Sequence, residues 1–181
     1  MTSTLITGGA RSGKSTLAQE MGKKAKGPVL FVATAEAGDE EMTRRINAHK
    51  KDRPQSWKTL EIQNHIGREI LKAPGGAKTV IIDDITLLVM NVFTSCGEKS
   101  PPETIEKALS EEIRELIDCV RHSQADFIIV TNEVGLGIIP ADIVSRLYRD
   151  LLGKANRQLA AAMDNVYLMV AGIPVVVKGK L

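Results

Sequence analysis

Cysteine, surplus charge and long apolar runs are all scarce in this sequence of 181 residues, and each scarcity excludes a class of protein. Two cysteines, Cys96 and Cys119, are too few for a disulfide framework and fit the reducing cytoplasm, where we expect the protein to work. A net charge of only +2 gives no basic surface for nucleic acid. No apolar run approaches the roughly 18 residues that cross a membrane, and the N-terminus has no basic-plus-apolar signal pattern.

What the sequence does contain is the composition of an ordinary globular protein. Apolar residues make up 43% and charged residues 25% of the chain, which excludes a disordered or fibrous protein. The length fits one domain with a substantial core, and no linker, repeat or low-complexity segment divides it. We therefore expect a single domain over residues 1–181.

The strongest local signal is the phosphate-loop pattern G-x-x-x-x-G-K-[ST] at residues 8–15. Glycines let backbone amides converge on phosphate oxygens, the lysine carries positive charge to the β- and γ-phosphates, and the serine can ligate Mg²⁺. A predicted strand precedes the pattern and a predicted helix follows it, so the helix dipole also favours an anion. The sequence thus predicts a nucleotide site formed by Gly8, Gly9, Ala10, Arg11, Ser12, Gly13, Lys14 and Ser15.

A second signal is the apolar run over residues 78–84 that ends in Asp83 and Asp84. It has the form of a Walker B strand, which brings a carboxylate to the phosphate loop to hold Mg²⁺ or its water shell. We expect Asp83 to serve the metal together with Ser15. The alternative is an aspartate that only caps the following helix.

Further apolar strands over residues 28–34, 125–131, 166–170 and 175–178 alternate with helical patterns. This order predicts an α/β fold with a mostly parallel sheet flanked by helices on both faces and a closing C-terminal hairpin. A helix is expected from Pro140 to Leu152, with a break or bend at Gly153 and further helical residues from Lys154 to Met163. Because ligands bind at the carboxyl ends of parallel strands, Thr34, Asp83 and residues 131–133 should converge on one site.

These patterns leave the kind of nucleotide protein open. A regulatory GTPase would show Asn-Lys-x-Asp, whereas the nearest candidate is Thr131-Asn132-Glu133-Val134, and no Asp-x-x-Gly follows the Walker B strand. A DNA-dependent motor would need more basic loops. A small-molecule kinase that uses Mg²⁺ is the simplest interpretation.

Longer segments carry a more specific resemblance. Residues 6–15, 45–54, 130–140 and 149–160, together with Gly172-Ile173-Pro174, closely resemble the bifunctional adenosylcobinamide kinase/adenosylcobinamide-phosphate guanylyltransferase family of cobalamin biosynthesis. The resemblance follows the family's order over essentially the whole chain. It implies a P-loop NTPase with a RecA-like sheet, a homotrimer, and ATP and GTP as substrates.

The resemblance also implies two reactions on a corrinoid. ATP or GTP first phosphorylates the hydroxyl of adenosylcobinamide, and GTP then donates GMP to adenosylcobinamide phosphate, which gives adenosylcobinamide-GDP and pyrophosphate. The family carries the guanylyl group on a histidine, and His49 holds the matching position. We expect Lys50, Lys51 and Arg53 to hold the departing pyrophosphate, because cationic side chains suit phosphate oxygens. Glu61, at the end of a short predicted strand, completes the expected nucleotide site.

The residues themselves also allow plainer interpretations. His49 lies in a predicted helix over residues 39–51 and shares a face with Met42 and Ile46, where a histidine is usually just packed. Asp83-Asp84 departs from the acidic residue followed by cysteine that many relatives have, so Asp84 is a possible substitute or partner for the metal. A single-activity kinase and a non-enzymatic, nucleotide-controlled binding protein are the rival functions.

Overall fold

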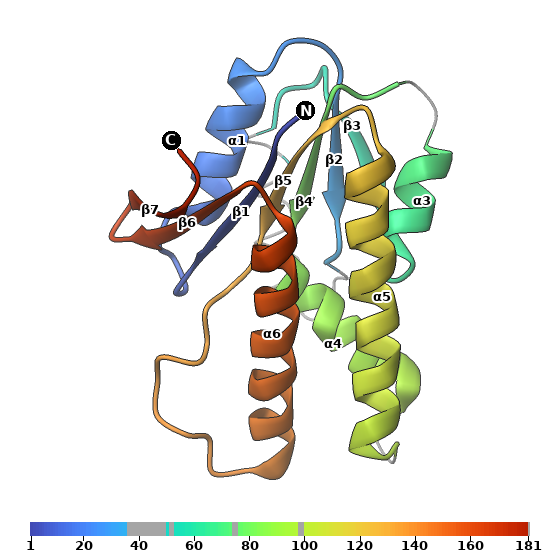
Figure 1. The fold of residues 1–181 in the computed structure, drawn as a ribbon, viewed down its shortest axis with the longest axis vertical. Helices are drawn as coiled ribbons and strands as arrows, with labels where there is room; N and C mark the ends of the chain where they lie inside the picture. Colours follow the sequence, from blue (N-terminus) through green and yellow to red (C-terminus); the bar gives the residue numbers. More distant parts are fainter. Residues whose placement is uncertain (36–49, 51–52, 74–75, 98–99, 181) are drawn as a thin grey trace.

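A computed structural model describes residues 1–35, 50, 53–73, 76–97 and 100–180 of the chain. These residues form one seven-stranded sheet with helices packed on both faces (Figure 1). The strand order is β3-β2-β4-β5-β1-β6-β7, and all neighbours are parallel except the final pair. The predicted α/β class is confirmed, and so is the closing hairpin, which β6 and β7 form.

The strands are short and mostly buried, as expected where helices cover both faces of a parallel sheet. They are β1 (Ser3–Gly8), β2 (Val29–Ala33), β3 (Lys58–Glu61), β4 (Thr79–Asp83), β5 (Asp126–Val130), β6 (Asn165–Val170) and β7 (Ile173–Lys178). The helices are α1 (Lys14–Lys24), α3 (Ile66–Lys72), α4 (Ile85–Cys96), α5 (Pro102–His122) and α6 (Ile143–Ala162).

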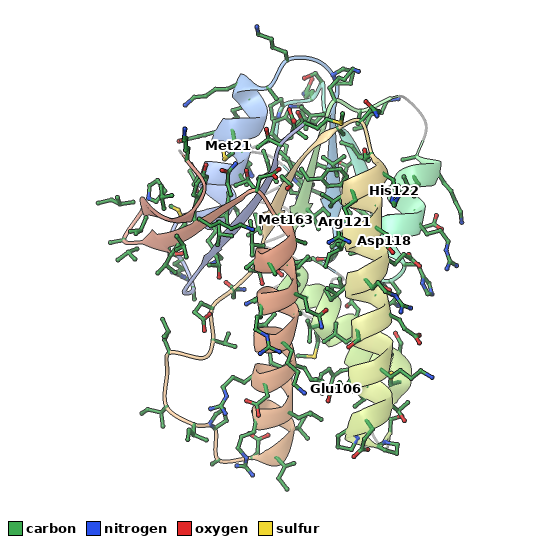
Figure 2. All side chains as sticks on the ribbon, viewed as in Figure 1. Met21, Glu106, Asp118, Arg121, His122 and Met163 are labelled. Atoms are coloured by element: carbon green, nitrogen blue, oxygen red, sulfur yellow. The ribbon has the colours of Figure 1, made fainter. Side chains whose placement is uncertain are left out.

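Two apolar cores hold the helices against the sheet. Successive strand residues face opposite sides, so Leu5 belongs to the core shared with α3, α4, α5 and α6, whereas Ile6 belongs to the core shared with α1. Figure 2 labels one methionine of each helix layer: Met163, at the end of α6, lies in the first core, and Met21 on α1 packs against the second. The parallel strands are therefore fixed from both sides.

The carboxyl ends of four central strands meet at one edge of the sheet. Gly8, Ala33, Asp83 and Val130 end β1, β2, β4 and β5, and the pairings place Asp83 beside both Ala33 and Val130. In Figure 1, α4 and long parts of α5 and α6 extend beyond this edge. The predicted site residues at the strand ends are thus brought to the same edge.

One helix differs from its prediction. α6 runs without interruption from Ile143 to Ala162, so Gly153 does not break it, and the helix begins after Pro140. The helical residues expected beyond Gly153 are part of this same helix. Asp142 caps it, because its carboxylate accepts a hydrogen bond from the Ser145 amide at 2.7 Å. Burial of Leu152 and its neighbours against the core outweighs the cost of about 1 kcal/mol for a glycine inside a helix.

Other expectations stay predictions. The helix expected over residues 39–51 falls almost entirely outside the described residues, and His49 and Lys51 lie there too. Within the part of the chain that the structure describes, no helix is both long and apolar enough to cross a membrane. The cytoplasmic location is not tested by this finding.

Candidate nucleotide site

The phosphate loop connects β1 to α1, as its sequence predicts. Gly8 ends β1 with φ 150°, and Gly13 precedes α1 with φ 94°. A Cβ atom at Gly8 would lie 2.7 Å from the backbone oxygen of Met169, so a larger residue does not fit there. The glycines therefore serve both the turn and the close approach of the neighbouring strand β6.

Lys14 lies inside this loop. Its side chain is buried, with 7% of its surface exposed, and its Nζ donates a hydrogen bond to the Gly9 carbonyl at 2.7 Å. Burial lowers the pKa of Lys14, while the negative charges of Asp84 and Asp83 act in the opposite direction. The two carboxylates favour the charged form of Lys14. A partly desolvated cation is suited to bind an anion at the loop.

Ser15 and Asp83 connect the loop to the Walker B strand. The Ser15 hydroxyl donates a hydrogen bond to Asp83 Oδ1 at 3.2 Å, which joins the first turn of α1 to the end of β4. Hydroxyl and carboxylate oxygens are hard ligands of the kind that Mg²⁺ prefers. The two residues predicted to serve a metal are thus neighbours in the fold.

Asp84 has different surroundings. Its Oδ1 accepts a hydrogen bond from the Leu87 amide at 2.9 Å, so Asp84 is the N-cap of α4, and Asn132 Nδ2 donates to its Oδ2 at 3.3 Å. Burial, followed by the charge of Asp83, raises the pKa of Asp84 to about 6. Of the two aspartates, Asp84 is therefore the one that caps the following helix.

Thr34 supports Asp84 from the end of β2. Its side chain is fully buried; the hydroxyl donates to the Asp84 carbonyl at 2.7 Å and accepts from the Asp84 amide at 3.0 Å. The hydroxyl is therefore already engaged by the protein. A direct nucleotide contact of Thr34 remains a prediction.

Sequence patterns did not single out a polar network that extends this support to α6. Asn132 donates to Thr86 Oγ1 through its side chain at 2.8 Å, and Asn156 donates to the Asn132 carbonyl at 2.9 Å. Asn156 also accepts a hydrogen bond from the Thr131 hydroxyl at 2.6 Å. The amide of Glu133 then donates to the Gly8 carbonyl at 3.0 Å, so the end of β5 is tied to the phosphate loop. An asparagine within a helix is only a weak sequence signal for such a role.

Arg53, Lys50 and Glu61 form a second group near β2 and β3. Lys50 Nζ lies 2.5 Å from Glu61 Oε1, and the Arg53 guanidinium lies over the Phe31 ring, with Cζ 3.6 Å from the ring centroid. Burial lowers the pKa of Arg53, whereas the charges of Asp83 and Glu61 oppose that shift. Arg53 Nε and Nη1 are buried without a hydrogen-bond partner among the described residues. These two donors are available to an anion.

A separate groove lies away from the phosphate loop. It has a volume of about 790 Å³, is lined by residues of α3, α4 and α5, and contains none of the predicted site residues. Its most buried carboxylate, Glu112, accepts hydrogen bonds from the His65 and Ile66 amides and so stabilises the start of α3. The groove therefore adds no residue to the nucleotide site.

Comparison with solved structures supports the fold alone. The chain is similar to the RadB recombinase, with a TM-score of 0.55 at 14% identity over 99% of this chain and 82% of that one. It is also similar to an ATPase of the type III secretion system of pathogenic bacteria, with a TM-score of 0.56 at 14% identity, over 93% of this chain and 51% of that one. The expected RecA-like P-loop fold is confirmed.

Comparison with protein sequences is more specific. The family model described as cobinamide kinase / cobinamide phosphate guanyltransferase matches residues 4–177. The bifunctional adenosylcobalamin biosynthesis proteins CobU of Salmonella typhimurium and of Escherichia coli are each 39% identical to the chain, over 96% of it and 98% of their own length. The protein CobP of Pseudomonas aeruginosa is 35% identical over 97% of both chains. The chain thus belongs to the cobinamide kinase / cobinamide phosphate guanylyltransferase family.

Proposed function

We propose that this protein phosphorylates adenosylcobinamide with ATP or GTP and then transfers GMP from GTP to adenosylcobinamide phosphate, which releases pyrophosphate. The observation that carries the proposal is the phosphate loop with buried Lys14 and the Ser15–Asp83 contact, in a chain of this family. Phosphoryl transfer needs mainly positioning and charge stabilisation, which this arrangement offers.

In the kinase step, the loop amides and Lys14 hold the donor phosphates, and the hydroxyl oxygen of the corrinoid side chain forms a bond to the γ-phosphorus as the bond to the β-phosphate oxygen breaks. The nucleoside diphosphate leaves, and the hydroxyl proton is released to water. The oxygen atoms of Ser15 and Asp83 fit Mg²⁺, which in proteins is usually held by one or two carboxylates together with substrate phosphates. When bound, the metal would neutralise charge that develops on the departing nucleoside diphosphate.

In the guanylyl step, we assign the nucleophile to His49. One imidazole nitrogen bonds to the α-phosphorus of GTP and pyrophosphate leaves; an oxygen of adenosylcobinamide phosphate then takes over the GMP as the nitrogen–phosphorus bond breaks. A neutral imidazole is available at neutral pH because its ordinary pKa is about 6.5. Arg53, with two buried donors, and Lys50 are candidates to hold the pyrophosphate.

The experiment that tests this function is incubation of the purified protein with GTP labelled at the α-phosphate. We expect a covalently labelled protein that passes GMP to adenosylcobinamide phosphate. A single-activity kinase would phosphorylate an alcohol without ever becoming labelled. A binding protein would retain nucleotide and turn over neither substrate.

Asp83 should be more important than Asp84 for Mg²⁺. Asp83→Asn should raise the Mg²⁺ concentration for half-maximal activity by about 10- to 100-fold, because it removes a charged oxygen beside Ser15. Asp84→Asn keeps an oxygen that can cap α4 and should change this concentration less than about threefold. Mg²⁺ titration of both variants measures the difference, and a larger shift in Asp84→Asn would reverse the assignment.

We also propose a homotrimer. Its support is a run of exposed apolar side chains between β5 and the start of α6, comprising Val134, Leu136, Ile138, Ile139, Ile143 and Val144. Exposed apolar side chains commonly mark a protein interface where they form one patch. Sedimentation equilibrium should give three times the mass of the chain, and Ile138→Ser, at a side chain that is 96% exposed, should lower it. A wild-type protein that sediments as a monomer contradicts the trimer.

A further inference from the structure

The side of α6 that faces the sheet carries a polar residue among apolar ones. Leu152, Ala155 and Leu159 are buried in the first core, and Asn156 is four residues after Leu152 and three before Leu159, so it shares their face. Asparagine is a weak helix former, and a leucine at this position would bury more apolar surface. Helix stability alone therefore does not account for Asn156.

Both ends of the Asn156 side-chain amide are bound to the segment that follows β5. Its Nδ2 donates to the Asn132 carbonyl at 2.9 Å, and its Oδ1 accepts from the Thr131 hydroxyl at 2.6 Å. A carbonyl can only accept a hydrogen bond, so the nitrogen of Asn156 must face Asn132 and the oxygen must face Thr131. The amide group thus has one orientation, which the end of β5 dictates.

The peptide group that Asn156 contacts also contacts the phosphate loop. The Asn132 carbonyl and the Glu133 amide belong to one planar peptide unit, and the Glu133 amide donates to the Gly8 carbonyl at 3.0 Å. The C=O and N–H of a trans peptide point in opposite directions. The bond from Asn156 on one side therefore directs the N–H group toward Gly8 on the other.

The first residue of the phosphate loop has little room to move. A Cβ atom at Gly8 would lie 2.7 Å from the Met169 backbone oxygen on β6, and the bond from Glu133 holds Gly8 on the side of β5. The next carbonyl of the loop, that of Gly9, accepts a hydrogen bond from Lys14 Nζ at 2.7 Å. A shift of Gly8 would therefore also move the lysine charge.

Asn132 is held a second time, by α4. Its backbone amide and its Nδ2 both donate to Thr86 Oγ1, at 3.1 Å and 2.8 Å. These bonds fix the peptide before Asn132, whereas the bond from Asn156 fixes the peptide after it. Loss of the Asn156 donor should thus release the peptide that faces Gly8 and leave Asn132 attached to α4.

We propose that Asn156 is a positioning residue for both transfers: it orients the Asn132–Glu133 peptide and, through it, the phosphate loop. This inference rests on the proposed bifunctional activity. A misplacement of about 1 Å can cost about 100-fold in rate, because the transition state needs its charges stabilised at fixed positions. Binding of the ground state tolerates such a shift better, so the effect should appear in kcat more than in KM.

The test compares Asn156→Asp with Gln158→Glu. Both variants replace an amide with a carboxylate on α6, but Gln158 is exposed. Asn156→Asp keeps an oxygen for the Thr131 hydroxyl and loses the donor to the Asn132 carbonyl. We expect kcat to fall about 10- to 100-fold in phosphorylation and in guanylyl transfer, with the nucleotide KM within about threefold. Gln158→Glu should leave all these values within about twofold.

Two further measurements separate positioning from stability. The Kd of the β,γ-imido analogue of ATP, measured by calorimetry, should stay within about threefold in Asn156→Asp, and thermal melting should show the variant folded at the assay temperature. Thr131→Val keeps Asn156 but removes the hydroxyl that fixes its amide. It should lower both kcat values in the same direction by a smaller factor, about fivefold.

Three outcomes would overturn the proposal. One is a pair of kcat values in Asn156→Asp equal to those of Gln158→Glu or, should Asn156→Asp not fold, unchanged values in Thr131→Val. Another is a rise in KM and in the Kd of the analogue with unchanged kcat, which would mean that Asn156 supports binding alone. The third is a fall in kcat equal to the fraction of unfolded protein, which would make the role structural. A wild-type protein that binds the analogue but catalyses neither reaction would instead contradict the proposed function itself.

Discussion

Lys14→Ala should lose both phosphorylation and guanylyl transfer, with kcat/KM reduced by about 1,000-fold or more in each assay. The side chain is buried in the phosphate loop and its Nζ already donates to the Gly9 carbonyl, so its charge is fixed where phosphate oxygens would bind. Both proposed reactions need that charge on the same phosphates. A point charge in a partly desolvated loop is also more effective than one in water.

The matched control is Lys24→Ala, which removes a lysine from the exposed last turn of the same helix. It should leave both rates within about twofold, since an exposed charge more than a helical turn away is screened. Ser15→Ala should also impair both steps and should raise the Mg²⁺ concentration for half-maximal activity. Near-normal rates for Lys14→Ala in the two assays would contradict a shared phosphate site.

His49→Asn should abolish covalent labelling by α-labelled GTP and reduce guanylyl transfer by about 1,000-fold or more, because the proposed nucleophile is gone. Phosphorylation should remain within a few-fold of wild type, since that step needs only positioning and charge stabilisation of the γ-phosphoryl group. The adduct of the wild-type protein should be acid-labile and comparatively stable to alkali, as a nitrogen–phosphorus bond is. A serine or threonine ester would not behave in this way.

The other two histidines are the controls. His65 precedes α3 with φ 56°, a conformation that asparagine tolerates well. The hydrogen bond that its backbone amide donates to Glu112 does not depend on the His65 side chain. His122 is in the last turn of α5, where Nδ1 lies 2.8 Å from the Asp118 carbonyl. His65→Asn and His122→Asn should label normally. If peptide mapping assigns the label to a residue other than His49, the proposed carrier is wrong.

Much of the site could be predicted from the sequence because its parts are local. The glycines of the phosphate loop, Lys14 and Ser15 follow one another along the chain, and the turn from strand to helix dictates their spacing. The α/β fold followed from apolar runs that alternate with helical patterns. Gly153 does not break α6 because local propensity is weaker than burial in the first core.

What only the tertiary structure decided depends on contacts between distant segments. In the sequence, Asp83 and Asp84 are adjacent and both are candidates for the metal. The register of β4 and the packing of α1 and α4 placed Ser15 beside Asp83 and made Asp84 a helix cap.

The position of Arg53 over Phe31 and of Gly172 against Ser12 also joins segments far apart in the chain. Sequence alone therefore determined which residues form the phosphate-loop pattern, because that pattern needs adjacent groups. The fold determined what surrounds them, because burial and hydrogen-bond partners exist only after distant strands have paired.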